Sequence, residues 1–234
     1  MSKTNTRFIS TKKNIREQVY DLLRARMRLG EIGFGDRLVD HEIAAELNVS
    51  RMPVREAMMQ LKNEGLLEGT SRGFILRQFT PTDIAQIFEI RLLLEPEAAM
   101  QACRNATIEK LAILNTHAQS TEQAHQQNDP LAYMEANDRF RASWLNMTPN
   151  THLRETIQRL SNHVEAVRLA TLREAKYRAL SLQYTQELLQ GFIEENPEKA
   201  AQAIRSNLRR AALSYYSTLD VLLENPPVGS SALA

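Results

Sequence analysis

The chain has 234 residues, a length that accommodates one large or two modest domains. Hydrophobic residues make up 43% and charged residues 24%, which is typical of a globular protein. The single cysteine, Cys103, excludes an intrachain disulfide and a cysteine-rich zinc site. No apolar run approaches the length of a membrane span, and the polar N-terminus lacks the apolar core of a signal peptide. We therefore expect a cytoplasmic protein that does not contact a membrane.

The net charge of +1 hides an uneven distribution. Residues 1–79 hold 14 Lys and Arg against 10 Asp and Glu, whereas residues 80–234 hold 15 against 18. A positive N-terminal part is expected of a domain that lies near nucleic-acid phosphates. A solvated, charged helix face would give the same counts, so charge alone leaves both interpretations open.

The N-terminal part begins with two predicted helices. An apolar stripe predicts the first over residues 12–29, and Gly30 ends it because glycine suits the left-handed backbone after a helix. The second is short and covers residues 41–47, with Asp40 as its N-terminal cap. Asn48 follows it, and asparagine tolerates the left-handed conformation that a tight turn requires.

A third helix and a hairpin follow that turn. The helix is predicted over residues 51–64, with Ser50 as its cap and Pro53 in its first turn, where a missing N–H has no consequence. Residues 66–76 form two short apolar runs around a polar turn, the pattern of a β-hairpin. Three helices and a hairpin predict a winged helix-turn-helix.

The third helix carries the residues that we expect to read DNA. Arg51 and Arg55 are four positions apart and project from one face at its N-terminal end, where arginine can bind guanine or phosphate. His41 begins the preceding helix, and Arg72 and Gly73 form the hairpin tip, which in such folds contacts phosphates or the minor groove. Alternatively, any of these could be an ordinary surface residue with no role in DNA binding. The predicted DNA-binding set is His41, Ser50, Arg51, Met52, Arg55, Arg72 and Gly73.

After residue 79 the pattern changes to long amphipathic helices without strand signals. Glycine and proline are sparse, at eight each, which favours helix. Predicted helices cover residues 80–103, 107–127, 130–146, 150–171, 172–195 and 198–223. We therefore predict a mainly α protein with a DNA-binding domain at residues 12–79, an all-α domain at 80–224 and a disordered tail at 225–234.

The N-terminal motifs closely resemble the winged helix-turn-helix of GntR-family bacterial transcription regulators. Met52 stands where the family usually has threonine, which bears on base preference and not on DNA binding as such. The resemblance covers residues 12–79 and implies a DNA-binding regulator. It rests on Gly35-Asp36-Arg37-Leu38, Ile43-Ala44, the run from Val49 to Met58, Leu61, Glu64-Gly65-Leu66 and Arg72-Gly73-Phe74.

Residues 80–224 resemble the FCD effector domain of the FadR subfamily, an antiparallel helical bundle that binds a small ligand and dimerises. The resemblance rests on the opening helix, residues 87–99. Many such domains bind a divalent metal through an Asp-x-x-Phe-His motif and a histidine on each of two later helices. Aligned on Phe140, the four ligand positions hold residues that leave no metal site, and arginine cannot ligate a cation. These residues are Asn137, Arg141, Thr185 and Asn207.

Arg141 stands at a position that holds a metal ligand in many FCD domains, and its positive charge suggests an anionic effector in place of the metal. Arg141, with Arg91 or Arg168, would hold a carboxylate through paired hydrogen bonds. In the alternative, Arg141 pairs only with Glu95 or Glu165 and the pocket is apolar or degenerate. The predicted effector-binding residues are Arg91, Asn137, Arg141, Arg168, Thr185 and Asn207.

The sequence as a whole predicts a homodimeric transcription regulator, a repressor or an activator, that binds a pseudo-palindromic operator in double-stranded DNA. A small metabolite, an organic acid, would control its DNA affinity. The alternatives are a constitutive dimeric regulator with a non-sensing C-terminal domain, and a metal-dependent sensor. No cofactor is predicted, and no nucleophile–histidine pair, paired carboxylates or glycine-rich phosphate loop indicates an enzyme.

Overall fold

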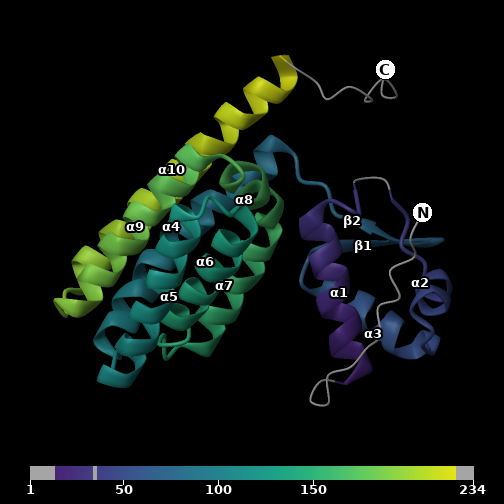
Figure 1. Cartoon of the computed structure of the whole chain (residues 1–234), viewed down its shortest axis with the longest axis horizontal. Helices are drawn as coiled ribbons and strands as arrows, with labels where there is room; N and C mark the ends of the chain where they lie inside the picture. The colour runs from purple at the N-terminus through teal and green to yellow at the C-terminus, as the bar shows by residue number, and fades with distance from the viewer. Residues whose placement is uncertain (1–13, 34–35, 225–234) are drawn as a thin grey trace. The chain divides into compact units, whose positions relative to one another are not determined.

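The computed structural model describes residues 14–33 and 36–224, and the side chains of all of these except residues 28, 166–167, 169–170 and 216–224. The chain divides into two compact units, one up to Thr80 and the other from Pro81 onward (Figure 1). The predicted tail and the first two residues of the first predicted helix lie outside the described residues.

The N-terminal unit is a winged helix-turn-helix, as predicted (Figure 1). The two strands pair antiparallel, with Leu67 opposite Leu76, and Leu38 forms an additional bridge to Phe74. The elements, in chain order, are α1 (Ile15–Leu29), α2 (Asp40–Leu47), α3 (Arg51–Asn63), β1 (Leu67–Thr70) and β2 (Gly73–Leu76).

Local sequence signals set most of these boundaries. The Asn14 side chain caps α1 by accepting a hydrogen bond from the Glu17 N–H at 2.9 Å, and Gly30 follows with φ 75°. Asn48 ends α2 with φ 53°. The prediction that Asp40 caps α2 was wrong: Asp40 is the first helical residue and its carboxylate binds another side chain, as described below.

The core of this unit lies where the three helices meet the hairpin. Val19 and Leu23 of α1 are fully buried, as are Val54, Met58 and Leu61 of α3. The spacing of the α3 residues places them on one face of the helix, so the opposite face, with both predicted DNA-reading arginines, remains exposed.

The C-terminal unit is an all-α bundle (Figure 1). In it α4 packs chiefly on α10, α5 on α6, and α9 on α10 and α5. The close approach of α9 and α10 requires Gly191, because a Cβ there would lie 2.8 Å from the Ala200 nitrogen. The described helices are α4 (Pro81–Arg104), α5 (Ile108–Gln126), α6 (Pro130–Leu145), α7 (Thr151–His163), α8 (Glu165–Leu172), α9 (Ala175–Ile193) and α10 (Pro197–Glu224).

The helix predicted over residues 150–171 is interrupted. Val164 has φ −100° and ψ 14°, outside the helical range, and separates α7 from α8. Its side chain is fully buried in the bundle, and the amphipathic pattern continues across the break, so the pattern gives no sign of it. The unit therefore has one more helix, among its described residues, than the sequence predicts.

Candidate DNA-binding surface and ligand cavity

The N-terminal end of α3 is open to an incoming partner. Ser50 has the extended backbone of a helix cap, yet its side chain makes no capping hydrogen bond. The first N–H groups of α3 are therefore left without that partner, and together with the helix dipole they favour a phosphate. Met52, one position into the helix, is 66% exposed.

Arg51 and Arg55 are both exposed but differ in their surroundings. The Arg51 guanidinium donates from Nη2 to Oδ1 of Asp40 at 3.0 Å, and the Asp40 side chain is only 15% exposed. The well-packed carboxylate therefore orients Arg51. Arg55 makes no hydrogen bond or ion pair with the residues that the structure describes. His41 is exposed, and its Nδ1 lies 4.0 Å from the same Asp40 oxygen.

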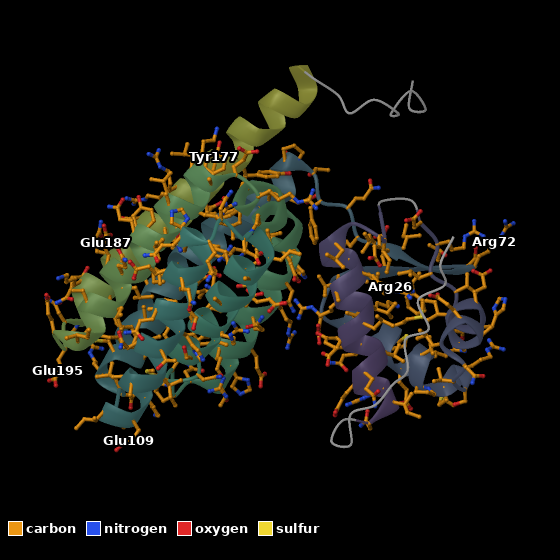
Figure 2. All side chains as sticks on the ribbon, viewed as in Figure 1. Arg26, Arg72, Glu109, Tyr177, Glu187 and Glu195 are labelled. Atoms are coloured by element: carbon orange, nitrogen blue, oxygen red, sulfur yellow. The ribbon has the colours of Figure 1, made fainter. Side chains whose placement is uncertain are left out.

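The hairpin tip forms the wing. Its turn is held by Thr70, whose hydroxyl donates to the Gly73 carbonyl at 3.1 Å and accepts from the Arg72 N–H at 3.3 Å. Figure 2 shows the Arg72 side chain at the tip, pointing away from the rest of the unit. Arg72 is thus free to reach a second groove or the phosphate backbone.

Gly73 is required by the backbone of the wing. Its φ is +132°, and a Cβ at this position would lie 2.4 Å from the Leu38 carbonyl oxygen. That oxygen accepts the Phe74 N–H at 2.9 Å, so it cannot withdraw without breaking the bridge to residue 38. The close approach and the backbone conformation both exclude other side chains.

We expect Gly73→Ala to destabilise the N-terminal unit by about 1–3 kcal/mol because of backbone strain and loss of the bridge to Leu38. Denaturant unfolding, followed by circular dichroism, measures the change. Gly69→Ala is a matched control in the same hairpin, since its nearest contact is the flexible Lys62 Nζ at 3.4 Å. Equal stability of the two variants would contradict the prediction.

The C-terminal unit contains a cavity of about 90 Å³ between α4, α6, α8, α9 and α10. Apolar side chains, including Phe88 and Trp144, form part of its wall. The structure brings together all six residues predicted to bind an effector, and that role stays a prediction. They are Arg91, Asn137, Arg141, Arg168, Thr185 and Asn207.

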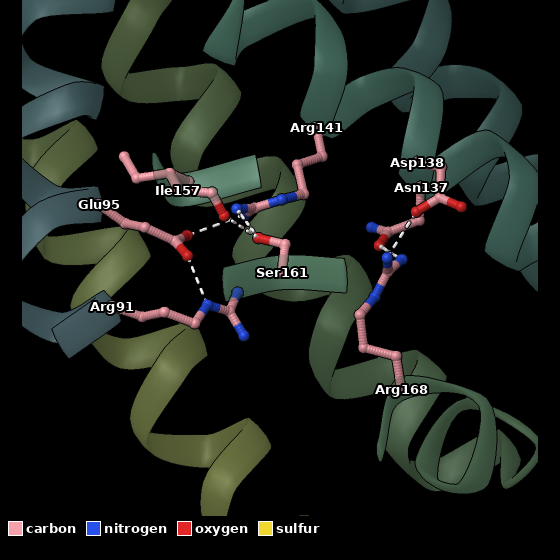
Figure 3. A network of polar contacts seen from close by, with 8 residues as sticks. All are labelled: Arg91, Glu95, Asn137, Asp138, Arg141, Ile157, Ser161 and Arg168. Carbon is pink, nitrogen blue, oxygen red and sulfur yellow. Dashed lines mark hydrogen bonds and ion pairs between the residues drawn. The ribbon is translucent and has the colours of Figure 1, made fainter. Parts of the chain in front are cut away.

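Glu95 is the centre of a buried ion network beside this cavity (Figure 3). Its side chain has no exposed surface and accepts from Arg91 Nε at 2.5 Å and from Arg141 Nη1 at 2.8 Å. Arg141 Nη2 also donates to the Ser161 hydroxyl at 2.6 Å, and Ser161 donates to the Ile157 carbonyl at 2.8 Å. The network joins α4, α6 and α7.

The pKa values in this network follow from burial and charge. Burial raises the pKa of Glu95, but the charges and hydrogen bonds of Arg141 and Arg91 outweigh it and hold that pKa at about 2. Burial lowers the pKa of Arg91, and the neighbouring Arg141 and Arg168 lower it further, against the opposing effect of Glu95. Glu95 is therefore ionised at neutral pH.

Arg168 forms a second ion pair in the cavity wall. It donates to Asp138 Oδ1 at 2.5 Å and to the Asn137 side-chain oxygen at 3.0 Å, which ties α8 to α6 (Figure 3). Burial lowers the pKa of Arg168, but the charge and hydrogen bond of Asp138 outweigh this and raise it. The contact to Asn137 engages that amide oxygen within the protein.

Arg141 forms an ion pair, as in the alternative to ligand binding, and its part in binding an effector stays a prediction. Its partner is Glu95, and its Nε is buried without a hydrogen-bond partner among the described residues. The guanidinium also lies over the Trp144 ring, with 5.6 Å from Cζ to the ring centroid. Arg141 thus has fewer free donors for a ligand than the sequence suggests.

The cavity wall includes several polar residues that were not predicted from the sequence. Arg210 lies three residues after Asn207 on α10, and Ser181 lies four before Thr185 on α9, so helical spacing from the predicted residues could have indicated both. No comparable signal marks the two tyrosines of the wall, Tyr177 and Tyr184.

A divalent metal does not fit this cavity. Its wall offers arginine, amide and hydroxyl groups, and in the described part of the chain no group of three or more His, Cys, Asp or Glu side chains is placed to hold a metal ion. Nearby guanidinium charges would repel a cation, and the neutral oxygens present are weak ligands by themselves.

The described helices also include none with a stretch long and apolar enough to span a membrane.

Comparison with known proteins identifies both units. Residues 15–73 match the family of bacterial regulatory proteins named gntR, and residues 86–210 match the FCD domain. The chain belongs to the GntR family. This member is a DNA-binding transcription regulator with an FCD domain, consistent with the FadR-like subfamily.

Curated relatives of this GntR-family chain are regulators of transcription. The uncharacterized regulator YdhC of Bacillus subtilis is 29% identical over 154 residues, covering 65% of this chain and 69% of the relative. The Nta operon transcriptional regulator of Aminobacter aminovorans is 28% identical over 135 residues, covering 57% and 64%. The gluconate operon transcriptional repressor of Bacillus subtilis is 42% identical over only 73 residues, or 31% and 30%.

Solved structures show the same fold. Escherichia coli McbR/YncC superimposes with a TM-score of 0.77 at 22% identity, covering 88% of this chain and 99% of that protein. A putative GntR regulator from Rhodococcus sp. RHA1 gives a TM-score of 0.72 at 21% identity, covering 86% and 97%. These similarities confirm the fold class.

Proposed function

We propose that this GntR-family regulator acts as a homodimer on a pseudo-palindromic operator, with one half-site for each α3. Arg51 and Arg55 would contact bases or phosphates in the major groove. His41, Ser50 and Met52 would flank them, and the wing residues Arg72 and Gly73 would approach the adjacent backbone or minor groove. The exposure of both arginines at the open end of α3 carries this proposal.

We propose further that a small metabolite, an organic acid, binds in the cavity and controls the affinity for DNA. The observation that carries this is the charge of the wall: it includes four arginines and, among the described residues, neither Asp nor Glu. Arg91, Arg141 and Arg168 would supply the positive field, and neutral hydrogen bonds would come from Asn137, Thr185 and Asn207.

The ligand would act by binding one arrangement of the dimer more tightly than another. A ligand shifts such an equilibrium only by its difference in affinity for the two states, so it must change the spacing or freedom of the two α3 helices. Release of DNA on ligand binding would make the protein a repressor, as the gluconate operon relative is named.

The test is operator binding with and without candidate ligands. The operator is selected from random duplexes by repeated binding and amplification, and its affinity is then measured at fixed salt across a panel of organic acids. We expect at least one acid to change operator affinity about fivefold or more. An unchanged affinity together with no stabilisation of the protein by any acid would favour the constitutive regulator. A requirement for added divalent metal would favour the metal sensor.

A further inference from the structure

Arg91 has two hydrogen-bond donors that the protein leaves unused. The residue is 5% exposed, and its Nε donates to Glu95, but Nη1 and Nη2 make no hydrogen bond with the described residues. Figure 3 shows these two nitrogens pointing away from Glu95. Arg91 belongs to the cavity wall, so its free end faces a space that a ligand can occupy. A guanidinium with one edge fixed and its end open is preorganised for a planar acid group.

The charges around this free end do not balance. Arg91 and Arg141 share the single carboxylate of Glu95, and Arg168 pairs with Asp138. With Arg210 of the cavity wall and Glu165, whose charge acts on Arg168, four guanidinium groups meet three carboxylates, which leaves one formal positive charge beside the cavity. Burial lowers the pKa of Arg91, which reports that its charge is poorly solvated. An anion at the free end would neutralise that excess.

Neutral polar groups also belong to the cavity wall. The Asn207 side chain and the Tyr184 hydroxyl make no hydrogen bond with the described residues, and both belong to the wall. The Thr185 hydroxyl donates to the Ser181 carbonyl at 3.0 Å, so its oxygen can still accept. Groups of this kind recognise a hydroxyl or carbonyl oxygen. Among the described residues of the wall there is no carboxylate to receive an ammonium group.

The volume limits the ligand's size. The cavity of about 90 Å³ is well below the roughly 300–1,000 Å³ of sites for drug-sized ligands, so it favours a compact ligand.

We propose that the free end of Arg91 binds the carboxylate of a compact hydroxy or keto acid, while Asn207 and Tyr184 bind its neutral oxygen. Arg141 is then a positioning residue, which holds Glu95 and through it the orientation of Arg91. This assignment rests on the proposed ligand control of DNA binding and specifies the chemistry of that ligand.

A matched trio of ligands tests the class. Lactate, lactamide and alanine share a three-carbon frame, but lactamide lacks the carboxylate and alanine replaces the hydroxyl by an ammonium group. We expect lactate or pyruvate to raise the melting temperature of the full chain in a dose-dependent manner in low-chloride buffer, and lactamide and alanine to have no effect. Equal stabilisation by lactamide or alanine would overturn the proposal, as would no stabilisation by lactate or pyruvate.

Variants test the assigned residues by calorimetric titration with lactate. Arg91→Lys retains a positive charge that can pair with Glu95 but loses Nη1 and Nη2, the two donors that would bind the carboxylate. We therefore expect at least a tenfold weaker affinity for lactate, about 1.4 kcal/mol. Arg159→Lys, at an exposed arginine without a partner among the described residues, is the control and should bind as the parent does. A larger loss in Arg141→Lys than in Arg91→Lys would place the carboxylate on Arg141 instead.

Asn207→Leu provides a test that does not depend on the buried ion network. We expect it to weaken lactate binding severalfold and to leave the binding of propionate, which lacks the hydroxyl, unchanged. Equal losses for the two acids would overturn the role of Asn207.

If a neutral metabolite changed operator affinity while no acid bound, the acid class would fail and ligand control would stand. If no compound bound or changed operator affinity, ligand control itself would fail.

Discussion

Replacing Glu95 by glutamine is expected to destabilise the helical unit by about 3–5 kcal/mol at neutral pH. Glutamine removes the carboxylate that Arg91 and Arg141 share, so two buried or nearly buried guanidinium groups lose this countercharge. The loss also releases the links from α4 to α6 and α7. Denaturant unfolding at pH 7, followed by circular dichroism and Trp144 fluorescence, measures the change.

The same substitution predicts a pH dependence with a definite sign. The pKa of Glu95 is lowered from 4.5 to about 2, so the folded state favours the ionised form. Its contribution is fully present above pH 4.5 and is lost as the pH falls toward 2. The stability difference between parent and Glu95→Gln should therefore shrink over that interval. Glu89→Gln, at an exposed position of α4, is the control and should cost less than about 0.5 kcal/mol. A difference that stayed constant down to pH 2 would contradict the buried ion network.

Arg55→Ala should weaken specific operator binding by about 1–3 kcal/mol, which is about 5- to 150-fold. Arg55 is exposed at the open end of α3 and has no partner among the described residues, so its guanidinium is available for DNA. Arg51 differs, because it must keep or exchange its contact with Asp40 when DNA binds. The measurement is operator affinity by fluorescence anisotropy at several salt concentrations, with an unrelated duplex for comparison.

Lys62→Ala is the matched control for Arg55→Ala. Lys62 lies in the last turn of the same helix, so its loss removes one positive charge far from the predicted contact end. We expect a small effect that is similar for operator and unrelated DNA. Equal loss in both variants would mean that α3 contributes charge and not base recognition. Unchanged operator affinity in Arg55→Ala would remove Arg55 from the predicted DNA-binding set.

The sequence by itself determined the N-terminal architecture because local rules act there. Gly30 and Asn48 occupy backbone positions that their residue types favour, and the apolar spacing of α3 fixes which face is buried. The face of Arg51 and Arg55 follows from that spacing. Helix formation in the C-terminal unit was equally predictable, since amphipathic periodicity is a property of neighbouring residues.

Tertiary structure decided what each charge does. Glu95 and Arg141 lie far apart in the sequence, and only the packing of α4 against α6 shows that Glu95, and not Glu165, is the carboxylate bound to Arg141. The break at Val164 is likewise not indicated by the local amphipathic pattern, which continues across it. Periodicity places a residue on a face, but the partner of a buried charge is set by the packing of distant helices. That packing leaves the end of Arg91 open and engages Arg141, although the sequence presents both simply as arginines on helices.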